Sequence, residues 1–245
     1  MAKSTPRLFV DQPLGAGLEV ALAAEQAHYL GTVLRLVPGD AVAVFNGRDG
    51  EFLAYVAEAA KKKMLLRLER LTSAAAPPPD IDYLFAPLKH TRLDYLVQKA
   101  TELGARRLRP VITARTIAER VNLERMRANV IEAAEQCNLV FLPEVLEPVS
   151  LNAALRGWES GRALIYCDEA AEPGNAVAAL SKLKTPAAIL VGPEGGFTVE
   201  ERAMLKALPF VTAISLGPRI MRADTAAVAI LALVQAVLGD WGTRA

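Results

Sequence analysis

The sequence predicts an α/β protein of two domains, in which a small β-barrel precedes a larger domain built on a parallel sheet. Residues 1–72 contain short apolar segments with no room between them for crossover helices, which is typical of antiparallel strands. Residues 73–80 include three consecutive prolines, which stiffen a linker and keep it out of a sheet. From residue 81, strands alternate with helices, and this pattern favours parallel strands.

The first domain, residues 1–72, is expected to contain five strands and one helix. The helix lies around Ala24–Leu34, and Lys61–Lys63 are expected at the tip of a hairpin. The expected strands are Leu8–Val10, Leu18–Leu22, Ala41–Phe45, Phe52–Ala57 and Met64–Leu71. Turn-forming residues such as Asn46-Gly47 separate them.

The second domain, residues 81–245, is expected to alternate strands and helices. Thr198 and Glu201 have the spacing of a capping box, so a helix should start there. The expected strands are Ile81–Ala86, Arg162–Asp168, Ile189–Val191 and Thr212–Leu216. The other expected helices are Thr91 to Gly104, Asn122–Cys137, Ala176–Leu183 and Ala226–Leu238.

The last expected helix, Ala226–Leu238, has Gln235 as its single polar residue. Asp224 or Thr225 is expected to cap it. A helix that is apolar all round must be covered all round, which suggests a partner surface as well as a core. We therefore expect a homodimer.

The composition does not by itself indicate nucleic-acid binding, because the chain has 28 Lys and Arg and 27 Asp and Glu and is therefore almost neutral. Any basic surface must be local. No apolar signal core and no uninterrupted membrane-spanning run is present, so we expect a soluble, cytoplasmic protein without a membrane partner. Two cysteines, Cys137 and Cys167, and two histidines, His28 and His90, form no metal-binding spacing, so neither a metal site nor a disulfide framework is expected.

Two apolar strands in the last quarter of the chain each end in a Gly-Pro turn before a helix. The first turn spans Gly192–Gly196, and the second begins at Gly217-Pro218 and continues as the loop Ile220–Ala223. The carboxyl ends of adjacent parallel strands are where open α/β sheets place their ligands. The spacing matches neither the dinucleotide nor the triphosphate glycine motif, so a neutral heterocycle is the better candidate. Ordinary strand-ending turns remain the alternative.

The segments VGPEGGFTVEE and SLGPRIMRADTA resemble the two C-terminal motifs of the RsmE family, the 16S ribosomal RNA uridine N3-methyltransferases of the SPOUT superfamily. The resemblance implies a trefoil-knotted parallel-sheet domain behind a PUA-like β-barrel. It also implies S-adenosylmethionine as the cofactor and homodimerisation through the knotted domain. The implied substrate is 16S rRNA in the assembled small ribosomal subunit, methylated at N3 of one uridine of the decoding-centre helix.

The resemblance places the cofactor on the two turns and on the loop before the last helix, beside the end of the strand Arg162–Asp168. The residues implied to bind it are Leu190, Val191, Gly192, Pro193, Gly195, Gly196, Ser215, Leu216, Gly217, Ile220, Met221, Thr225 and Ala226.

The implied reaction requires the N3 anion of uracil, which a cation beside a uracil carbonyl would stabilise. Arg222 is the first candidate because it lies on the loop before the last helix, and Arg219 is the second, with loop packing as its alternative role. Glu194 and Asp224 are candidate bases. Asp224 replaces the glutamate that is commoner in the family, which favours a capping duty, and the proton could also leave through water.

Five cations are candidate contacts to RNA phosphates, which position a substrate without reading its sequence. They are Arg7, Arg35, Lys89, Arg92 and Arg115. The family usually has an arginine where this chain has Leu139, so that arginine's role is in doubt here.

Two other functions compete with this hypothesis. A knotted methyltransferase acting on the ribose 2′-hydroxyl would end differently in its second motif. A non-catalytic RNA-binding assembly factor would use the barrel alone, and it would not need both glycine turns. S-Adenosylmethionine binding distinguishes the second alternative from the main hypothesis.

Overall fold

The computed structural model describes residues 5–60, 63–89, 91–117, 120–171 and 174–242. These residues form two compact units. The first comprises the described residues up to Ala76 together with Ala134–Leu142, and the second comprises Pro77–Ala133 and the described residues from Pro143 onward. No helix in the described ranges is both long enough and apolar enough to span a bilayer.

The first unit is a five-stranded sheet with one short helical segment. Its elements are β1 (Arg7–Phe9), β2 (Glu19–Ala21), α1 (Ala24–His28), the π-helix η1 (Tyr29–Val33), β3 (Ala41–Phe45), β4 (Glu51–Ala60) and β5 (Lys63–Ser73). The strand order is β1-β3-β4-β5-β2. Alternate side chains of the strands point inward, and Val42, Val44, Ala54 and Leu66 have no exposed surface.

The five predicted strands of the first unit are confirmed, with shifted ends. The expectation of purely antiparallel pairing is wrong, because β1 pairs with β3 in parallel, Arg7 lying opposite Ala43. Lys61 and Lys62 of the predicted hairpin tip lie outside the described residues, and Ala60 and Lys63 on either side are paired. The predicted helix is confirmed as α1 followed directly by η1.

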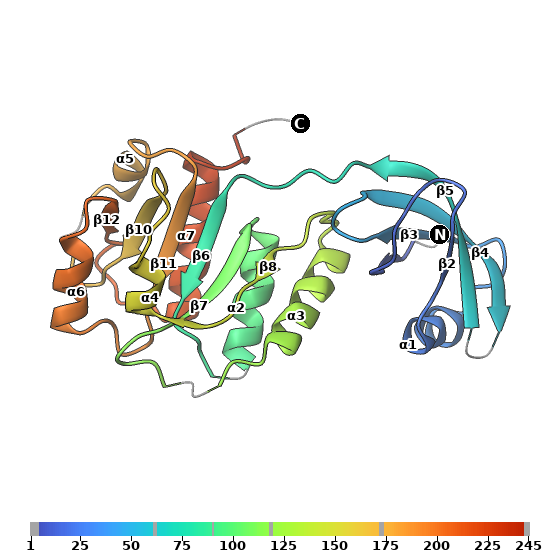
Figure 1. Cartoon of the computed structure of the whole chain (residues 1–245), viewed down its shortest axis with the longest axis horizontal. Coiled ribbons are helices and arrows are strands. Elements are labelled where there is room, and N and C mark those ends of the chain that lie inside the picture. Colours follow the sequence, from blue (N-terminus) through green and yellow to red (C-terminus); the bar gives the residue numbers. More distant parts are fainter. Residues whose placement is uncertain (1–4, 61–62, 90, 118–119, 172–173, 243–245) are drawn as a thin grey trace. The chain divides into compact units, whose positions relative to one another are not determined.

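The second unit alternates strands and helices, as Figure 1 shows. Its elements are β6 (Ile81–Phe85), α2 (Thr91–Glu102), β7 (Arg107–Ile112), α3 (Leu123–Gln136), β8 (Glu144–Val145), β9 (Val149–Ser150), α4 (Leu151–Leu155), β10 (Ala163–Cys167), α5 (Ala176–Leu180), β11 (Ala187–Val191), α6 (Val199–Lys206), β12 (Val211–Ile214) and α7 (Ala223–Val237). The last residues of α3 belong to the first unit, which the sequence did not predict.

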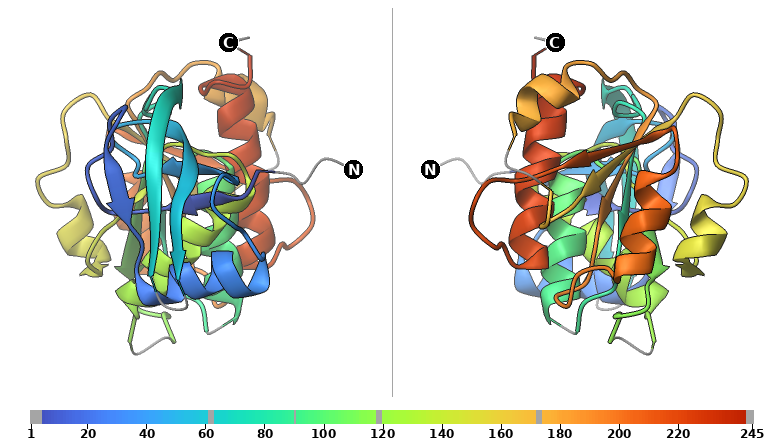
Figure 2. Two further views of the ribbon diagram at one scale, coloured as in Figure 1. Left: turned by 90° about the vertical axis from the view of Figure 1, so that its right-hand side faces the viewer. Right: turned by 90° about the vertical axis from the view of Figure 1, so that its left-hand side faces the viewer.

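The sheet of the second unit has the order β12-β10-β11-β6-β7-β8, with β9 beside β7. All of these strands pair in parallel, so the predicted α/β class with a parallel sheet is confirmed. Figure 2 shows α7 and α2 on one side of the sheet and α6 and α4 on the other. Both faces are therefore covered, and β6 and β11 are buried along their whole length.

Three further observations correct the predicted elements. The strands β7, β8 and β9 and the helix α4 were not predicted. β8 and β9 have two residues each and α4 has five, too few for a periodic signal, and β7 contains Pro110, which counts against a strand. The helix α7 begins at Ala223, with Arg222 in the N-cap position and no side-chain cap. Asp224 and Thr225 therefore lie in its first turn, and the prediction that one of them caps the helix is wrong.

An ion network around one buried arginine joins the amino-terminal ends of the strands. Arg162, only 4% exposed, donates hydrogen bonds to Asp80 at 3.0 Å and to Glu159 at 2.9 Å, and it lies 3.6 Å from Asp82. The hydrogen bonds from Arg162 are the main cause of a lowered pKa of Asp80, while burial raises the pKa of Asp82. The network fixes where the linker enters the sheet.

Arg162→Ala is expected to lower the free energy of unfolding of the second unit by about 2 kcal/mol, discounted because Asp80 and Glu159 are partly exposed. Urea unfolding followed by tryptophan fluorescence measures this change. Arg106→Ala, which removes a half-exposed cation 3.6 Å from Asp80, is the matched control and should cost under about 1 kcal/mol. Equal losses in the two variants would contradict a role for burial.

The difference in stability between the wild-type protein and Arg162→Ala should become smaller at low pH. Because the pKa of Asp80 is lowered in the folded state, its pairing stabilises the protein above the pKa of the unfolded chain, about 3.9. The contribution is lost as the pH falls through the folded-state pKa. The wild-type protein and Arg162→Ala should therefore converge in stability below about pH 4.

Candidate active site

A pocket of about 240 Å³ opens at the carboxyl ends of β10, β11 and β12. Because these strands are parallel neighbours, Cys167, Val191 and Ile214 end at the same edge of the sheet. The chain leaves this edge through the two glycine turns and through the loop that leads into α7. Burial raises the pKa of the Cys167 thiol to about 12, so this side chain is a neutral part of the wall.

The first glycine turn is shaped by Phe197. Its ring is 4% exposed and packs edge-on against Tyr166, with ring centroids 5.1 Å apart. A Cβ atom on Gly192 would lie 2.5 Å from this ring, so only glycine fits there. Gly196 has a φ of 65°, and a Cβ atom on it would lie 2.3 Å from a Glu169 carboxylate oxygen. The turn thus passes closely over both side chains and exposes its backbone to the pocket.

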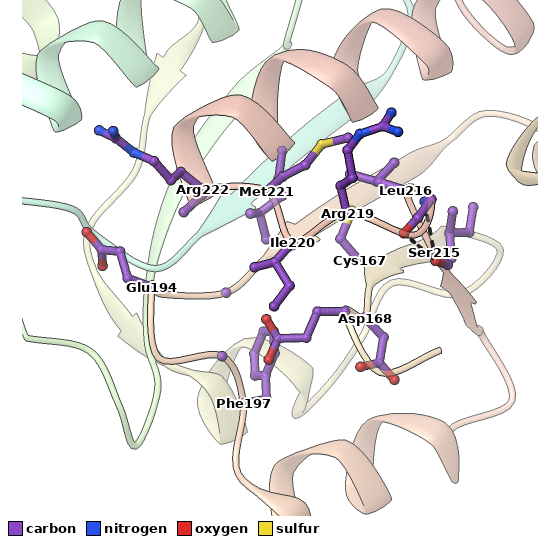
Figure 3. A pocket seen from close by; sticks show the side chains of 18 of the residues that line it. Cys167, Asp168, Glu194, Phe197, Ser215, Leu216, Arg219, Ile220, Met221 and Arg222 are labelled. Atoms are coloured by element: carbon purple, nitrogen blue, oxygen red, sulfur yellow. Dashed lines mark hydrogen bonds between the residues drawn. The ribbon is translucent and has the colours of Figure 1, made fainter. Parts of the chain in front are cut away.

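The second turn leads into a loop that closes the pocket from the side opposite Phe197. Gly217 has a φ of 105°, and Ser215 Oγ lies near its backbone N–H and C=O groups, at 3.4 and 3.5 Å. In Figure 3, Ile220 projects from the loop across the open pocket, while Arg219 and Arg222 leave the loop in opposite directions. Ile220 is 90% exposed, so a ligand could cover it.

Arg222 is a cation without a strong internal partner among the described residues. Its side chain is 65% exposed, and its Nε lies 3.8 Å from the Asp224 carboxylate. A guanidinium so placed is available to an anionic or carbonyl group of a ligand.

A buried carboxylate forms the floor of the pocket. Asp168 has no exposed side-chain surface, and Lys206 Nζ lies 2.8 Å from its Oδ2. Burial alone would raise the pKa of Asp168, but the hydrogen bonds from Lys206 and from the Ala170 N–H outweigh it, so the pKa is lowered. Arg202 lies 3.7 Å from Asp168 and donates to the Glu169 carboxylate at 2.8 Å. Arg202 thereby orients Glu169 over Gly196.

The outer side of the first turn is held by two arginines, one at the start of α2 and one in the loop after β7. Arg92 donates to the Glu194 carboxylate at 3.2 Å, and Arg115 donates to the Gly195 carbonyl at 2.7 Å. Glu201 makes a third contact between this turn and another segment. Its carboxylate closes the predicted capping box with Thr198, and it also accepts the Ala114 N–H at 2.8 Å. The start of α2 and the loop after β7 therefore hold the turn in position.

Most residues expected to bind the cofactor line this pocket. They are Val191, Gly192, Pro193, Gly196, Ser215, Leu216, Gly217, Ile220, Met221 and Ala226. Leu190, Gly195 and Thr225 are absent from the lining. Leu190 is fully buried in the core beneath the turn, and the Gly195 carbonyl faces Arg115.

Of the candidate catalytic residues, Arg222, Arg219 and Glu194 line the pocket. Asp224 does not. It lies in the first turn of α7, where a carboxylate is favoured by the helix dipole, and its Oδ1 accepts the Thr225 N–H at 3.2 Å. Glu194 lies at the mouth of the pocket, paired with Arg92.

The candidate RNA-binding cations are differently placed. Arg35, Lys89 and Arg115 are exposed, and Arg92 is partly exposed. Arg7, the first of the five candidate phosphate contacts, does not reach out of the surface. Its side chain is 9% exposed, pairs with Glu51 at 2.7 Å, lies over the Phe45 ring and donates to backbone carbonyls of residues 134, 135 and 139.

Sequence reasoning missed Asp168, Phe197 and Arg202 as individual pocket residues. A carboxylate directly after a buried strand, as in Asp168, was a usable signal, since the end of that strand was expected near the cofactor. Arg202 gave none, because an arginine in a helix is ordinarily solvated. Within the described ranges, no group of three His, Cys, Asp or Glu side chains is arranged to hold a metal ion.

Comparison with known proteins supports the interpretation of the pocket. The sequence matches the RNA methyltransferase domain over residues 75–235 and the RNA methyltransferase PUA domain over residues 22–69. The second match confirms the PUA-like first domain. The whole structure is similar to that of Ribosomal RNA small subunit methyltransferase E from Neisseria gonorrhoeae bound to S-adenosyl methionine. The TM-score is 0.86 and the identity 27%, over 97% of this chain and 99% of that one.

Curated relatives show the same similarity in sequence. Ribosomal RNA small subunit methyltransferase E of Rickettsia conorii is 32% identical, over 94% of each chain. The protein of that name from Synechocystis is 33% identical, over 89% of this chain and 73% of its own. The methyltransferase family covers more than half of the chain, and the resemblance carried by the two glycine turns is confirmed: the chain belongs to the RsmE family of RNA methyltransferases.

Proposed function

We propose that the protein methylates N3 of one uridine of 16S rRNA, in the decoding-centre helix of the assembled small ribosomal subunit, with S-adenosylmethionine as methyl donor. The observation that carries this proposal is the pocket at the ends of β10, β11 and β12, in which two glycine turns face a loop with two exposed arginines. Membership of the RsmE family supports it. In the cell, such a substrate would require a cytoplasmic enzyme.

The residues present fit this cofactor. Gly192 and Gly196 let the turn pass directly over Phe197 and Glu169, and both glycines line the pocket with their backbone. Phe197, Ile220 and Met221 supply apolar walls, and the backbone of both turns supplies hydrogen-bonding groups. When bound, the cofactor supplies a methyl group made electrophilic by its sulfonium.

The protein must favour the N3 anion of the uracil and hold N3 in line with the methyl–sulfur bond of the cofactor. Arg222 is our candidate for this role, because its exposed guanidinium can donate to a uracil carbonyl and favour the anion. Arg219, on the same loop, is the second candidate. The N3 proton would pass to Glu194 or to water, and Glu194 would first have to loosen its 3.2 Å pair with Arg92.

RNA phosphates would bind on the loops that follow β6 and β7. Lys89, Arg92 and Arg115 lie on these loops or at the start of α2, at the edge of the sheet that holds the pocket. Arg92 and Arg115 now hold Glu194 and Gly195, so a phosphate would compete with the turn for the same donors. RNA binding and the position of the turn would therefore be linked.

We also propose that the second domain, residues 81–245, is knotted and forms a homodimer. The apolar helix α7 packs on α2 and β11, yet Val228, Ala229, Ala232 and Leu233 stay partly exposed. A second copy of the chain would cover this face. Residues 1–72 would be the RNA-binding domain, since they include the segment 22–69 that matches the RNA methyltransferase PUA domain, and residues 73–80 would be the linker.

Methyl transfer to small ribosomal subunits that lack the modification tests the function. With labelled S-adenosylmethionine, label is expected in 16S rRNA of the subunits as 3-methyluridine at a single site, identified by nucleoside mass spectrometry. Naked 16S rRNA in parallel shows whether assembly is required. A ribose-methylated product would contradict the base chemistry, and no transfer to either RNA would contradict the proposal altogether.

A further inference from the structure

The first unit contains a groove of about 670 Å³ that no catalytic role explains. It runs between the start of η1, the segment before β3 and the segment 135–138, and every described residue that lines it belongs to the first unit. The lining residues used below are Arg7, Tyr29, Asp40, Glu135, Gln136 and Asn138. A cavity of this size can take a group as large as a nucleoside.

One side of the groove presents an aromatic ring. Tyr29 is 46% exposed, and within the described chain its side chain has no hydrogen bond and no ring partner. Tyr29 is also the first residue of the π-helix η1. The π-helix is rare in proteins, and where it occurs it is often at a functional site. An exposed ring beside a groove is a stacking platform for a planar ligand.

The other side presents two side-chain amides. Gln136 and Asn138 are exposed, and neither side chain makes a hydrogen bond within the described ranges. Asn138 has a φ of 56°, which places it in the left-handed region, where asparagine is enriched among non-glycine residues. An amide carries both a donor and an acceptor, so these two residues can match the polar edge of a nucleobase.

The charges of the groove exclude a phosphate from its interior. The Arg7 guanidinium is already used by Glu51 and by carbonyls of the segment 134–139. Asp40 and Glu135 add carboxylates, which accept the Val37 and Phe9 N–H groups. Among the described lining residues no cation is left for a phosphate, so the groove suits a neutral ring better than a phosphate.

A cation lies next to the groove in the chain, although it does not line the groove itself. Arg35 is exposed and lies between Leu34 and Leu36, which both line the groove. Its φ of 57° is uncommon for a residue other than glycine and turns its side chain away from the helical path. A nucleotide could therefore place its base in the groove and its phosphate at Arg35.

We propose that this groove binds one unpaired nucleobase of the RNA substrate. Tyr29 stacks on the base, the amides of Gln136 and Asn138 bond to its edge, and Arg35 contacts the adjacent phosphate. The inference rests on the proposed function in that the substrate is RNA. It adds a base-specific contact made far along the chain from the methyl-transfer pocket.

Binding of a labelled short single-stranded oligoribonucleotide to the full chain, saturated with S-adenosylmethionine, tests the groove by fluorescence anisotropy. Tyr29→Ala is expected to weaken binding roughly 5- to 30-fold, while Tyr29→Phe keeps the ring and most of the affinity. Tyr55→Ala is the matched control, since Tyr55 is 37% exposed on β4 and lies outside the groove. Gln136→Ala, which removes an amide without placing alanine at a positive φ, should change the preference among bases, and Arg35→Ala should weaken binding of all sequences alike.

Methyl transfer to small subunits, measured with the same variants, separates the possible failures. Wild-type affinity of Tyr29→Ala for the oligoribonucleotide, at an unchanged melting temperature, would overturn the nucleobase site. If Tyr29→Ala lost only transfer to subunits, the groove would hold a ribosomal protein segment and the proposal would also fall. If the wild-type protein transferred no methyl group, the proposed function would fail, and the oligoribonucleotide affinities would still decide the groove.

Discussion

Replacing Arg222 with alanine is expected to lower kcat for methyl transfer roughly 100- to 1000-fold, the loss seen when one preorganised donor to a developing anion is removed. The uracil N3 anion spreads its charge onto its carbonyl oxygens, and Arg222 is the candidate donor to one of them. Its guanidinium is 65% exposed and 3.8 Å from Asp224, so its removal breaks no buried contact. The fold and the affinity for S-adenosylmethionine should stay near wild type.

Steady-state kinetics on small subunits and cofactor titration by calorimetry measure the two sides of this expectation. Arg222→Lys keeps the charge and loses the planar pair of donors, so its kcat should lie between those of wild type and Arg222→Ala. Arg219→Ala is the matched control on the same loop and should cost less. A larger loss in Arg219→Ala would exchange the roles of the two arginines.

The pattern of the kinetic change also matters. If Arg222→Ala raised KM for RNA at an unchanged kcat, Arg222 would be a substrate contact rather than a group that acts on the reacting base. Suppression of kcat at an unchanged KM fits stabilisation of charge in the transition state.

The site could be located from the sequence because its signals are local. A buried strand, a Gly-Pro break and a capping box follow one another within Ala187–Glu201, and each has its own chemical signature. The structure bears out the strand β11, the turn and the box formed by Thr198 and Glu201. The same locality explains why the parallel sheet was predicted from alternating strands and helices.

The rest depends on contacts between residues distant in sequence. Arg7 was a candidate contact to RNA phosphates, but its partners include carbonyls about 130 positions later, which no window of sequence can show. The same holds for Arg115, which bonds Gly195, and for Arg202, which reaches Asp168 and Glu169. Asp224 was expected as a cap because Asp is a good N-cap, yet Arg222 takes that position.

Replacing Gly192 in the first turn is expected to have the second large effect, on the affinity for the cofactor. Gly192→Ala is expected to weaken S-adenosylmethionine binding roughly 10- to 100-fold, because overpacking a tight site costs strain that binding must overcome. The new Cβ atom would lie 2.5 Å from the Phe197 ring. That ring cannot retreat, since it is 4% exposed and packed edge-on against Tyr166, so the turn itself has to move.

Calorimetric titration with the cofactor measures the loss, and the melting temperature reports whether the fold survives. Gly242→Ala is the matched control, because a Cβ atom there meets no atom within 4 Å and the backbone is not strained. Adding Phe197→Leu to Gly192→Ala relieves the steric conflict and should restore part of the affinity. Wild-type affinity in Gly192→Ala would mean that the first turn does not hold the cofactor, and the binding site would have to be sought on the loop Gly217–Arg222 alone.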